Sequence, residues 1–98
     1  MIVGYPGVRL FWTKHAVVEA LEDNFDVSEI EGAIRVVVET PEFEEDKRRG
    51  VVKVGNRYCT LIYKKKKRGM VIITCWESNK TDIDEYHKSM RGKKRGVV

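Results

Sequence analysis

The chain has 98 residues, the length of one domain, and 42% of them are apolar, enough for one core. No apolar run approaches the roughly 18 residues of a membrane-spanning helix, so we expect no membrane partner. The start of the sequence has neither the basic stretch nor the long apolar segment of a secretion signal, which predicts a cytoplasmic location. We expect a single domain over residues 1–90, followed by a basic, flexible tail over residues 91–98.

Charge is divided unequally between the two halves of the chain. Residues 1–50 carry 6 basic and 11 acidic side chains, whereas residues 51–98 carry 13 basic and 4 acidic ones. A basic half is the usual electrostatic footprint of a polyanionic partner. Solubility and adaptation to heat explain it equally well, because a chain rich in Lys, Glu and Arg is typical of thermophile proteins.

The cysteines and histidines do not form a recognisable metal site. Zinc needs four ligands at short spacings, and His15 and His87 are far apart in the sequence. The two cysteines, Cys59 and Cys75, are too few for a disulfide framework, and we expect both to be reduced. The sequence therefore predicts no metal and no cofactor.

Two helices are expected to come first and to form a hairpin. Thr13 can cap a helix over about residues 13–23, where apolar residues recur at helical spacing. Ser28 and Glu31 form a capping box for a second helix. This helix should end by about Glu39, because a proline follows two residues later.

The second half of the chain is expected to form strands. Residues 51–54, 58–64 and 70–77 are rich in β-branched and aromatic side chains. A Gly55-Asn56 turn joins the first two strands, and a basic loop over residues 65–69 joins the last two. The acidic segment 42–46 could be an edge strand or a loop, and a further helix capped by Thr81 closes the domain.

Matching residue types across the strands predicts their register. Val54 should face Arg57 across the first turn, and Tyr58 should face Trp76 in the second hairpin. This register gives one apolar face to lie under the helices and a second face with aromatic residues between cations. The apolar face would carry Val52, Val54, Cys59, Leu61, Tyr63, Val71, Ile73 and Cys75. The expected fold class is α+β, with an N-terminal helical hairpin packed on a twisted three- or four-stranded antiparallel sheet and a C-terminal helix.

The second face of the sheet is the main functional candidate. Exposed aromatic rings stack on unpaired bases while lysine and arginine bind phosphates, as single-stranded RNA requires. The alternative is that the aromatic residues pack under the acidic segment or under the C-terminal helix. The predicted RNA-binding residues are Lys14, Arg49, Lys53, Tyr58 and Trp76.

His15 is the candidate catalytic residue. It lies in the first turn of the first helix, and histidine is the side chain that most often serves as a general acid or base, for example in phosphodiester cleavage. The alternative is a helix-start hydrogen bond and packing against Trp12. The basic run over residues 64–68 could reach a phosphate backbone or could be a solvated hairpin tip that prevents edge pairing.

Four short motifs occur along the chain: Phe11-x-x-Lys14-His15-Ala16, Ser28-x-x-Glu31, Thr40-Pro41 and Val52-Lys53-Val54-Gly55-Asn56-Arg57-Tyr58. Together they resemble small domains of the RelE/BrnT-like toxin superfamily, in particular a branch of unassigned function whose members begin F-T-x-H-A. The resemblance covers about residues 11–78. It implies a metal-independent ribonuclease that often acts on messenger RNA, free or ribosome-bound, and that a small antitoxin protein often inhibits. It also implies two N-terminal helices on an antiparallel sheet.

Within this resemblance, only His15, Gly55 and Tyr58 match positions of the superfamily. Members often carry arginine one turn after the histidine, where this chain has Glu19, so an anion replaces a cation near the scissile phosphate. Three hypotheses follow: an RNA-cleaving, toxin-like domain of a toxin–antitoxin system, a non-catalytic RNA-binding module, and a protein-interaction domain. Each leaves a homodimer open.

Overall fold

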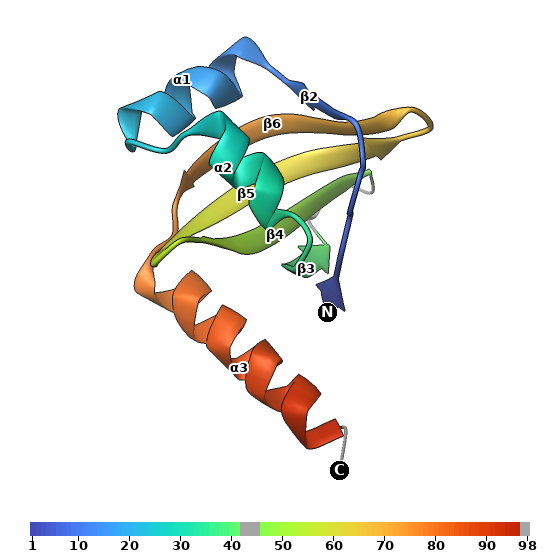
Figure 1. Cartoon of the computed structure of the whole chain (residues 1–98), viewed down its shortest axis with the longest axis vertical. Coiled ribbons are helices and arrows are strands. Elements are labelled where there is room, and N and C mark those ends of the chain that lie inside the picture. Colours follow the sequence, from blue (N-terminus) through green and yellow to red (C-terminus); the bar gives the residue numbers. More distant parts are fainter. Residues whose placement is uncertain (42–45, 97–98) are drawn as a thin grey trace.

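The computed structural model describes residues 1–41 and 46–96, which form six strands and three helices (Figure 1). No helix in these two ranges is both long enough and apolar enough to cross a membrane. In chain order the elements are β1 (Ile2–Val3), β2 (Leu10–Trp12), α1 (Lys14–Glu22), α2 (Val27–Ala33), β3 (Val37–Pro41), β4 (Lys47–Val54), β5 (Arg57–Lys66), β6 (Gly69–Glu77) and α3 (Lys80–Gly96).

The strands form one mixed sheet in the order β1-β3-β4-β5-β6-β2. Strand β2 runs parallel to β6, and the other neighbouring pairs are antiparallel. The predicted architecture is therefore wrong: strands precede the helices, and the sheet is six-stranded and mixed rather than three- or four-stranded and antiparallel. Residues 1–12 supply both edge strands. These are too short to show an alternating pattern, and pairing with distant strands stabilises them.

Helix α1 begins close to where the sequence predicts. The Thr13 hydroxyl accepts a hydrogen bond from the Ala16 amide at 3.1 Å, as an N-cap should, and donates one to the Ile73 carbonyl at 2.9 Å. The same side chain thus starts the helix and attaches it to β6.

Helix α2 is shorter than predicted. Its N-cap is Asp26, whose Oδ1 accepts from the Ser28 amide at 2.9 Å, so Ser28 is not the cap. The helix ends at Ala33 instead of about Glu39. The next residues include Val36, Val37 and Val38, and β-branched side chains favour the extended β3 that follows.

The β4–β5 register is the predicted one, with Val54 opposite Arg57 and Lys53 opposite Tyr58. The β5–β6 register is not. Thr60, and not Tyr58, faces Trp76, so this part of the pair is shifted by two residues from the predicted register. An irregularity between Ile62 and Tyr63 reduces the shift to one residue in the part nearer the turn. The hairpin therefore closes through a two-residue turn, Lys67-Arg68, and not through a loop over residues 65–69.

This register decides which side chains of β6 are buried. A shift of two residues keeps a side chain on its face, so Cys75 stays in the core and Trp76 stays on the second face. A shift of one residue moves it to the other face, so Met70 and Ile72 are buried in place of the predicted Val71 and Ile73.

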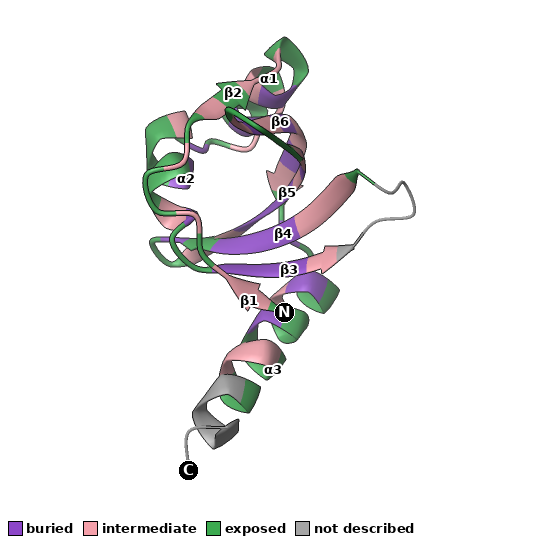
Figure 2. Ribbon diagram, turned by 90° about the vertical axis from the view of Figure 1, so that its right-hand side faces the viewer, coloured by how far each residue is buried: buried purple, intermediate pink, exposed green. Residues whose placement is uncertain are grey.

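Helices cover both faces of the sheet (Figure 2). Helix α1 packs on β6 and α2 on β4, above a core that includes Ala16, Ile30, Leu61 and Tyr63. Helix α3 packs on β3 and β4 from the other side, where Tyr86 forms a smaller cluster. That cluster also contains Val38, Val51, Ile2, Tyr58 and Met90.

The predictions for the cysteines and for the C-terminal segment have different outcomes. Both cysteines are buried free thiols. The bounds of α3 include residues 91–96, most of the segment expected as a tail, and the flexibility of that tail stays a prediction. Except for Asp46, the acidic segment 42–46 lies outside the described residues.

Candidate nucleic-acid interface

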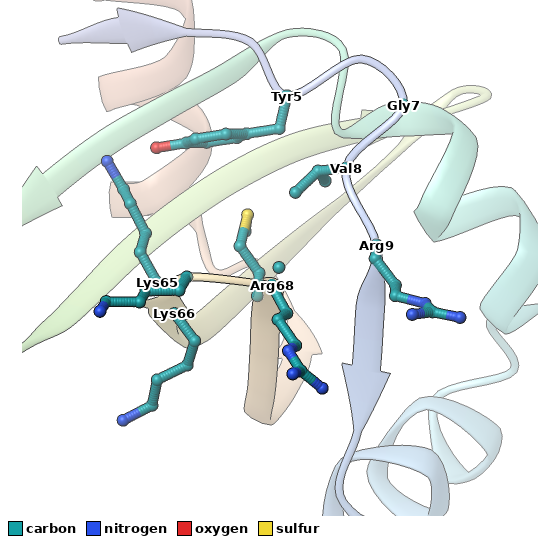
Figure 3. Close-up of a pocket in the computed structure, with 10 residues that line it drawn as sticks. Tyr5, Gly7, Val8, Arg9, Lys65, Lys66 and Arg68 are labelled. Carbon is teal, nitrogen blue, oxygen red and sulfur yellow. The ribbon is translucent and has the colours of Figure 1, made fainter.

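A cavity of about 410 Å³ lies between the N-terminal segment and the closed end of the β5–β6 hairpin (Figure 3). We call it the basic pocket. Besides Tyr5, its polar lining is cationic. In Figure 3 the Tyr5 hydroxyl points toward Lys65, while Arg9 and Arg68 extend in one general direction and Lys66 to the other side. The cations that line it are Arg9, Lys65, Lys66, Lys67 and Arg68.

The tight hairpin and Gly69 bring these cations together. Gly69 has a φ of 153°, and a Cβ there would lie 2.1 Å from the Arg9 carbonyl oxygen. The Met70 amide donates to that same oxygen at 2.9 Å. Glycine therefore lets the backbone at Arg9 approach the hairpin closely, which places an arginine from the N-terminal segment beside the basic turn.

A buried carboxylate, Glu39, contacts two residues that line the basic pocket, Tyr5 and Lys65. Its side chain is 1% exposed. Glu39 Oε2 accepts hydrogen bonds from the hydroxyls of Tyr5, at 2.5 Å, and of Tyr63. Its Oε1 lies 3.7 Å from Arg48 Nε and 3.6 Å from Lys65 Nζ. One side chain on β3 thus holds groups from the N-terminal segment, β4 and β5.

The pKa values of the groups around Glu39 keep Lys65 positively charged and the two tyrosines neutral. Burial raises the pKa of Glu39, but the two tyrosine hydroxyls and the two cations outweigh it and leave that pKa below its ordinary value. Burial and the hydrogen bonds to Glu39 raise the pKa values of Tyr63 and Tyr5. The hydrogen bond to Tyr5, opposed by desolvation, raises the pKa of Lys65. Near neutral pH the tyrosines are therefore neutral and Lys65 is charged.

The exposed part of the basic pocket keeps its positive charge. Within the described ranges, Lys67 and Arg68 form no ion pair, and both side chains are exposed. Glu39 faces the interior, where it offsets Arg48 and Lys65. The outer cations are therefore available to an anionic ligand.

The predicted residues on the second face lie on one side of the sheet, but α3 covers part of that side. Tyr58 and Trp76 are both half-buried. Tyr58 contacts the ring of Tyr86 on α3 at a centroid distance of 5.2 Å. Trp76 lies apart from this contact, 5.9 Å from the guanidinium carbon of Arg49. The two aromatic residues therefore do not form the single open stacking surface that the sequence predicts.

Arg49 takes part in an internal ion pair. It donates to Asp82 on α3, whose side chain is 6% exposed and also accepts from the Thr60 hydroxyl at 2.9 Å. A phosphate would have to compete with that carboxylate for Arg49. Lys53 is exposed on the same face.

His15 and Lys14 lie on a different surface. Both are exposed on α1, and His15 Nε2 is 3.7 Å from Glu19 Oε1. The buried residues of α1 pack on the face of the sheet opposite to Tyr58. The structure therefore does not bring His15 together with the aromatic residues of the second face.

Sequence reasoning missed residues on two elements. The sequence left open whether the basic run over residues 64–68 reaches a phosphate backbone, and it did not indicate Arg9 and Tyr5, which come from a segment with no periodic pattern. His87 is not among the predicted RNA-binding residues, yet it lies beside Tyr58 and Tyr86 on the exposed side of α3. The adjacent pair Tyr86-His87 on a helix with an inward apolar stripe was the available signal.

In the two described ranges, no group of three or more histidine, cysteine, aspartate or glutamate side chains is placed to hold a metal ion. Comparison with known proteins gives no match to any family model, curated protein or solved structure.

Proposed function

We propose that this protein binds single-stranded RNA through its phosphate backbone, with the basic pocket as the main contact. The observation that carries the proposal is that five cationic residues from two chain segments line one cavity. Cations that converge on a concave surface raise the local potential and attract phosphate groups. The resemblance to an RNA-cleaving superfamily favours RNA as the nucleic acid, and DNA of the same sequence is a comparison in the test.

The internal contacts support binding rather than solvation alone. Lysines that only prevented edge pairing at the hairpin tip would need no specific side-chain contacts. Lys65, however, contacts Glu39, and its Nζ lies 5.1 Å from the Tyr5 ring centroid. The Met70 amide donates to the Arg9 carbonyl, and Gly69 permits this close approach of the two backbones. Part of the phosphate site is thus organised before the ligand arrives, which lowers the entropic cost of binding.

A paired charge deletion tests the proposal. The double variant Lys67→Ala/Arg68→Ala should weaken binding of a labelled 12-nucleotide RNA at least tenfold, measured by fluorescence anisotropy. The slope of log affinity against log salt concentration should also become shallower, by roughly one phosphate contact for each cation removed. The control, Lys80→Ala/Lys88→Ala, removes the same charge from exposed positions on α3 and should change affinity less than about threefold. Equal losses in both variants would reject a specific pocket, and equal binding of DNA would reject RNA selectivity.

A second proposal is RNA cleavage by a toxin-like domain with a small antitoxin protein as partner. The observation that favours it is the exposed imidazole of His15, which has Lys14 beside it and the Glu19 carboxylate at 3.7 Å. In this reaction the 2′-hydroxyl loses its proton and attacks the adjacent phosphorus, the P–O5′ bond breaks, and the 5′-oxygen leaves with a proton, giving a 2′,3′-cyclic phosphate and a 5′-hydroxyl end. His15 would transfer the proton, and Glu19 would orient the imidazole.

Cleavage is tested with end-labelled RNA in chelator, with and without ribosomes. We expect products that carry cyclic phosphate ends, and His15→Ala should slow their formation at least a hundredfold, as general acid–base catalysis requires. The variant should still bind RNA in the anisotropy assay. Intact RNA under both conditions would exclude cleavage and leave RNA binding as the function.

A further inference from the structure

A second cavity, of about 350 Å³, lies where α3 crosses the end of β4 and β5. We call it the aromatic pocket. It lies on the face of the sheet opposite to α1 and α2, because Tyr58 and Tyr86 belong to the smaller cluster under α3. Its lining residues are Lys53, Tyr58, Tyr86, His87, Met90 and Arg91.

Three rings in this pocket hold one another in place. Tyr58 makes edge contacts with Tyr86 and His87, at centroid distances of 5.2 Å and 5.4 Å. The Tyr58 hydroxyl and His87 Nε2 lie within a hydrogen bond, at 2.7 Å. Tyr86 is buried, and its contacts with Tyr58 and His87 restrict the rotation of those two rings. The pocket thus presents aromatic surface in a fixed orientation.

The charges around the rings are all of one sign. Lys53 on β4 and Arg91 on α3 are exposed, and among the described lining residues none is acidic. Met90 adds a thioether, which packs well against aromatic surfaces. A ligand complementary to this lining has a flat aromatic part and a negatively charged part.

We infer that the aromatic pocket binds an unpaired base of the RNA, with Lys53 and Arg91 on the neighbouring phosphates; the inference rests on the proposed function. A nucleotide joins a flat ring to an anion, and bases stack on aromatic side chains regardless of their sequence. The structure replaces the predicted Tyr58–Trp76 platform with a site made of Tyr58, Tyr86 and His87.

The aromatic pocket and the basic pocket are distinct sites. Tyr58 and Lys65 are seven residues apart on β5, so they are separated by about 23 Å. The basic pocket recognises only phosphates, whereas the aromatic pocket requires a base. An RNA from which the bases have been removed separates the two contributions, because its charge and length are unchanged.

The test compares a 12-nucleotide RNA with a fully abasic strand of equal length by fluorescence anisotropy. Wild-type protein should bind the base-bearing strand about tenfold more tightly. His87→Ala and Tyr58→Leu should each reduce this preference at least threefold. His87 is exposed, so its replacement removes only edge contacts with Tyr58 and Tyr86 and leaves Tyr86 buried, and leucine keeps apolar volume at position 58. The variant Lys67→Ala/Arg68→Ala should weaken both strands equally and keep the preference.

The outcomes distinguish the two claims. Equal affinity of wild-type protein for both strands would overturn the base site and leave phosphate binding intact. A preference that survives both His87→Ala and Tyr58→Leu would place the base elsewhere, such as on Trp76, and would also overturn the inference. No binding of either strand would reject the proposed function together with the inference that rests on it.

Discussion

Glu39→Gln should lower the free energy of unfolding by about 3 kcal/mol at neutral pH, because it removes a charge that four neighbours are arranged to bind. The amide would keep one oxygen for the hydroxyls of Tyr5 and Tyr63. Its NH₂ group would then face Arg48 and Lys65, which are both cations. Urea denaturation followed by circular dichroism measures the loss. The control is Glu22→Gln at an exposed position of α1, which should change stability by less than about 0.5 kcal/mol.

The same variant should remove part of the pH dependence of stability. The pKa of Glu39 in the folded protein is lower than its ordinary value of 4.5. A carboxyl group with a lowered pKa stabilises the fold above its unfolded-state pKa, and this contribution is lost as the pH falls through the folded-state pKa. The difference between wild type and Glu39→Gln should therefore narrow below about pH 4. A difference of the same size at pH 7 and pH 3 would show that ionised Glu39 is not the stabilising form.

Asp82→Ala is expected to have the second largest effect, a loss of about 2 to 3 kcal/mol, because it disconnects the start of α3 from the sheet. The substitution leaves Arg49 without its carboxylate, and the buried Thr60 hydroxyl keeps only Ser78 as its partner, at 2.7 Å. Since Arg49 is partly exposed, water would recover some of the lost interaction.

The matched control for Asp82→Ala is Asp84→Ala. Both aspartates lie near the N-terminus of α3, where a negative charge interacts favourably with the helix dipole, but Asp84 is exposed. Hydrogen exchange should report faster opening of α3 in the Asp82 variant than in the Asp84 variant. Similar losses of stability in the two variants would mean that the helix dipole, and not the contact with Arg49 and Thr60, accounts for the effect.

The parts of the fold that could be predicted are those that local chemistry determines. The Gly55-Asn56 turn fixes the register of β4 and β5, and Gly55 has a φ of 65° that favours glycine. Thr13 could be identified as a helix cap because the cap and its helix are adjacent in the chain. Neither prediction required knowledge of a distant segment.

The parts that failed depend on contacts between distant segments. The irregularity after Ile62 changes the offset of β6, and matching residue types across the hairpin cannot reveal an extra residue. Glu39 was assigned to the end of a helix, whereas it is a buried residue of β3 whose partners come from three other segments. A buried carboxylate has no signature in a sequence until its cations and hydroxyls are located.

The candidate sites follow the same division. Tyr58 and Lys53 could be identified as ligand-binding candidates because they are opposite each other in a correctly predicted pair of strands. The ion pair of Arg49 with Asp82 could not be recognised, because it joins residues 33 positions apart. The role of His87 depends on how α3 crosses the sheet, which the sequence does not specify.

The placement of β1 and β2 on opposite edges has a consequence for how the protein is made. Residues 1–12 are synthesised before their partners, which are β3 and β6, and β6 ends at Glu77. During translation β1 can pair once β3 has left the ribosome, but β2 stays unpaired until β6 has emerged. Since Arg9 lies just before β2, the cations of the basic pocket come together only after the β5–β6 hairpin has emerged, and a chain truncated before β6 would lack this pocket.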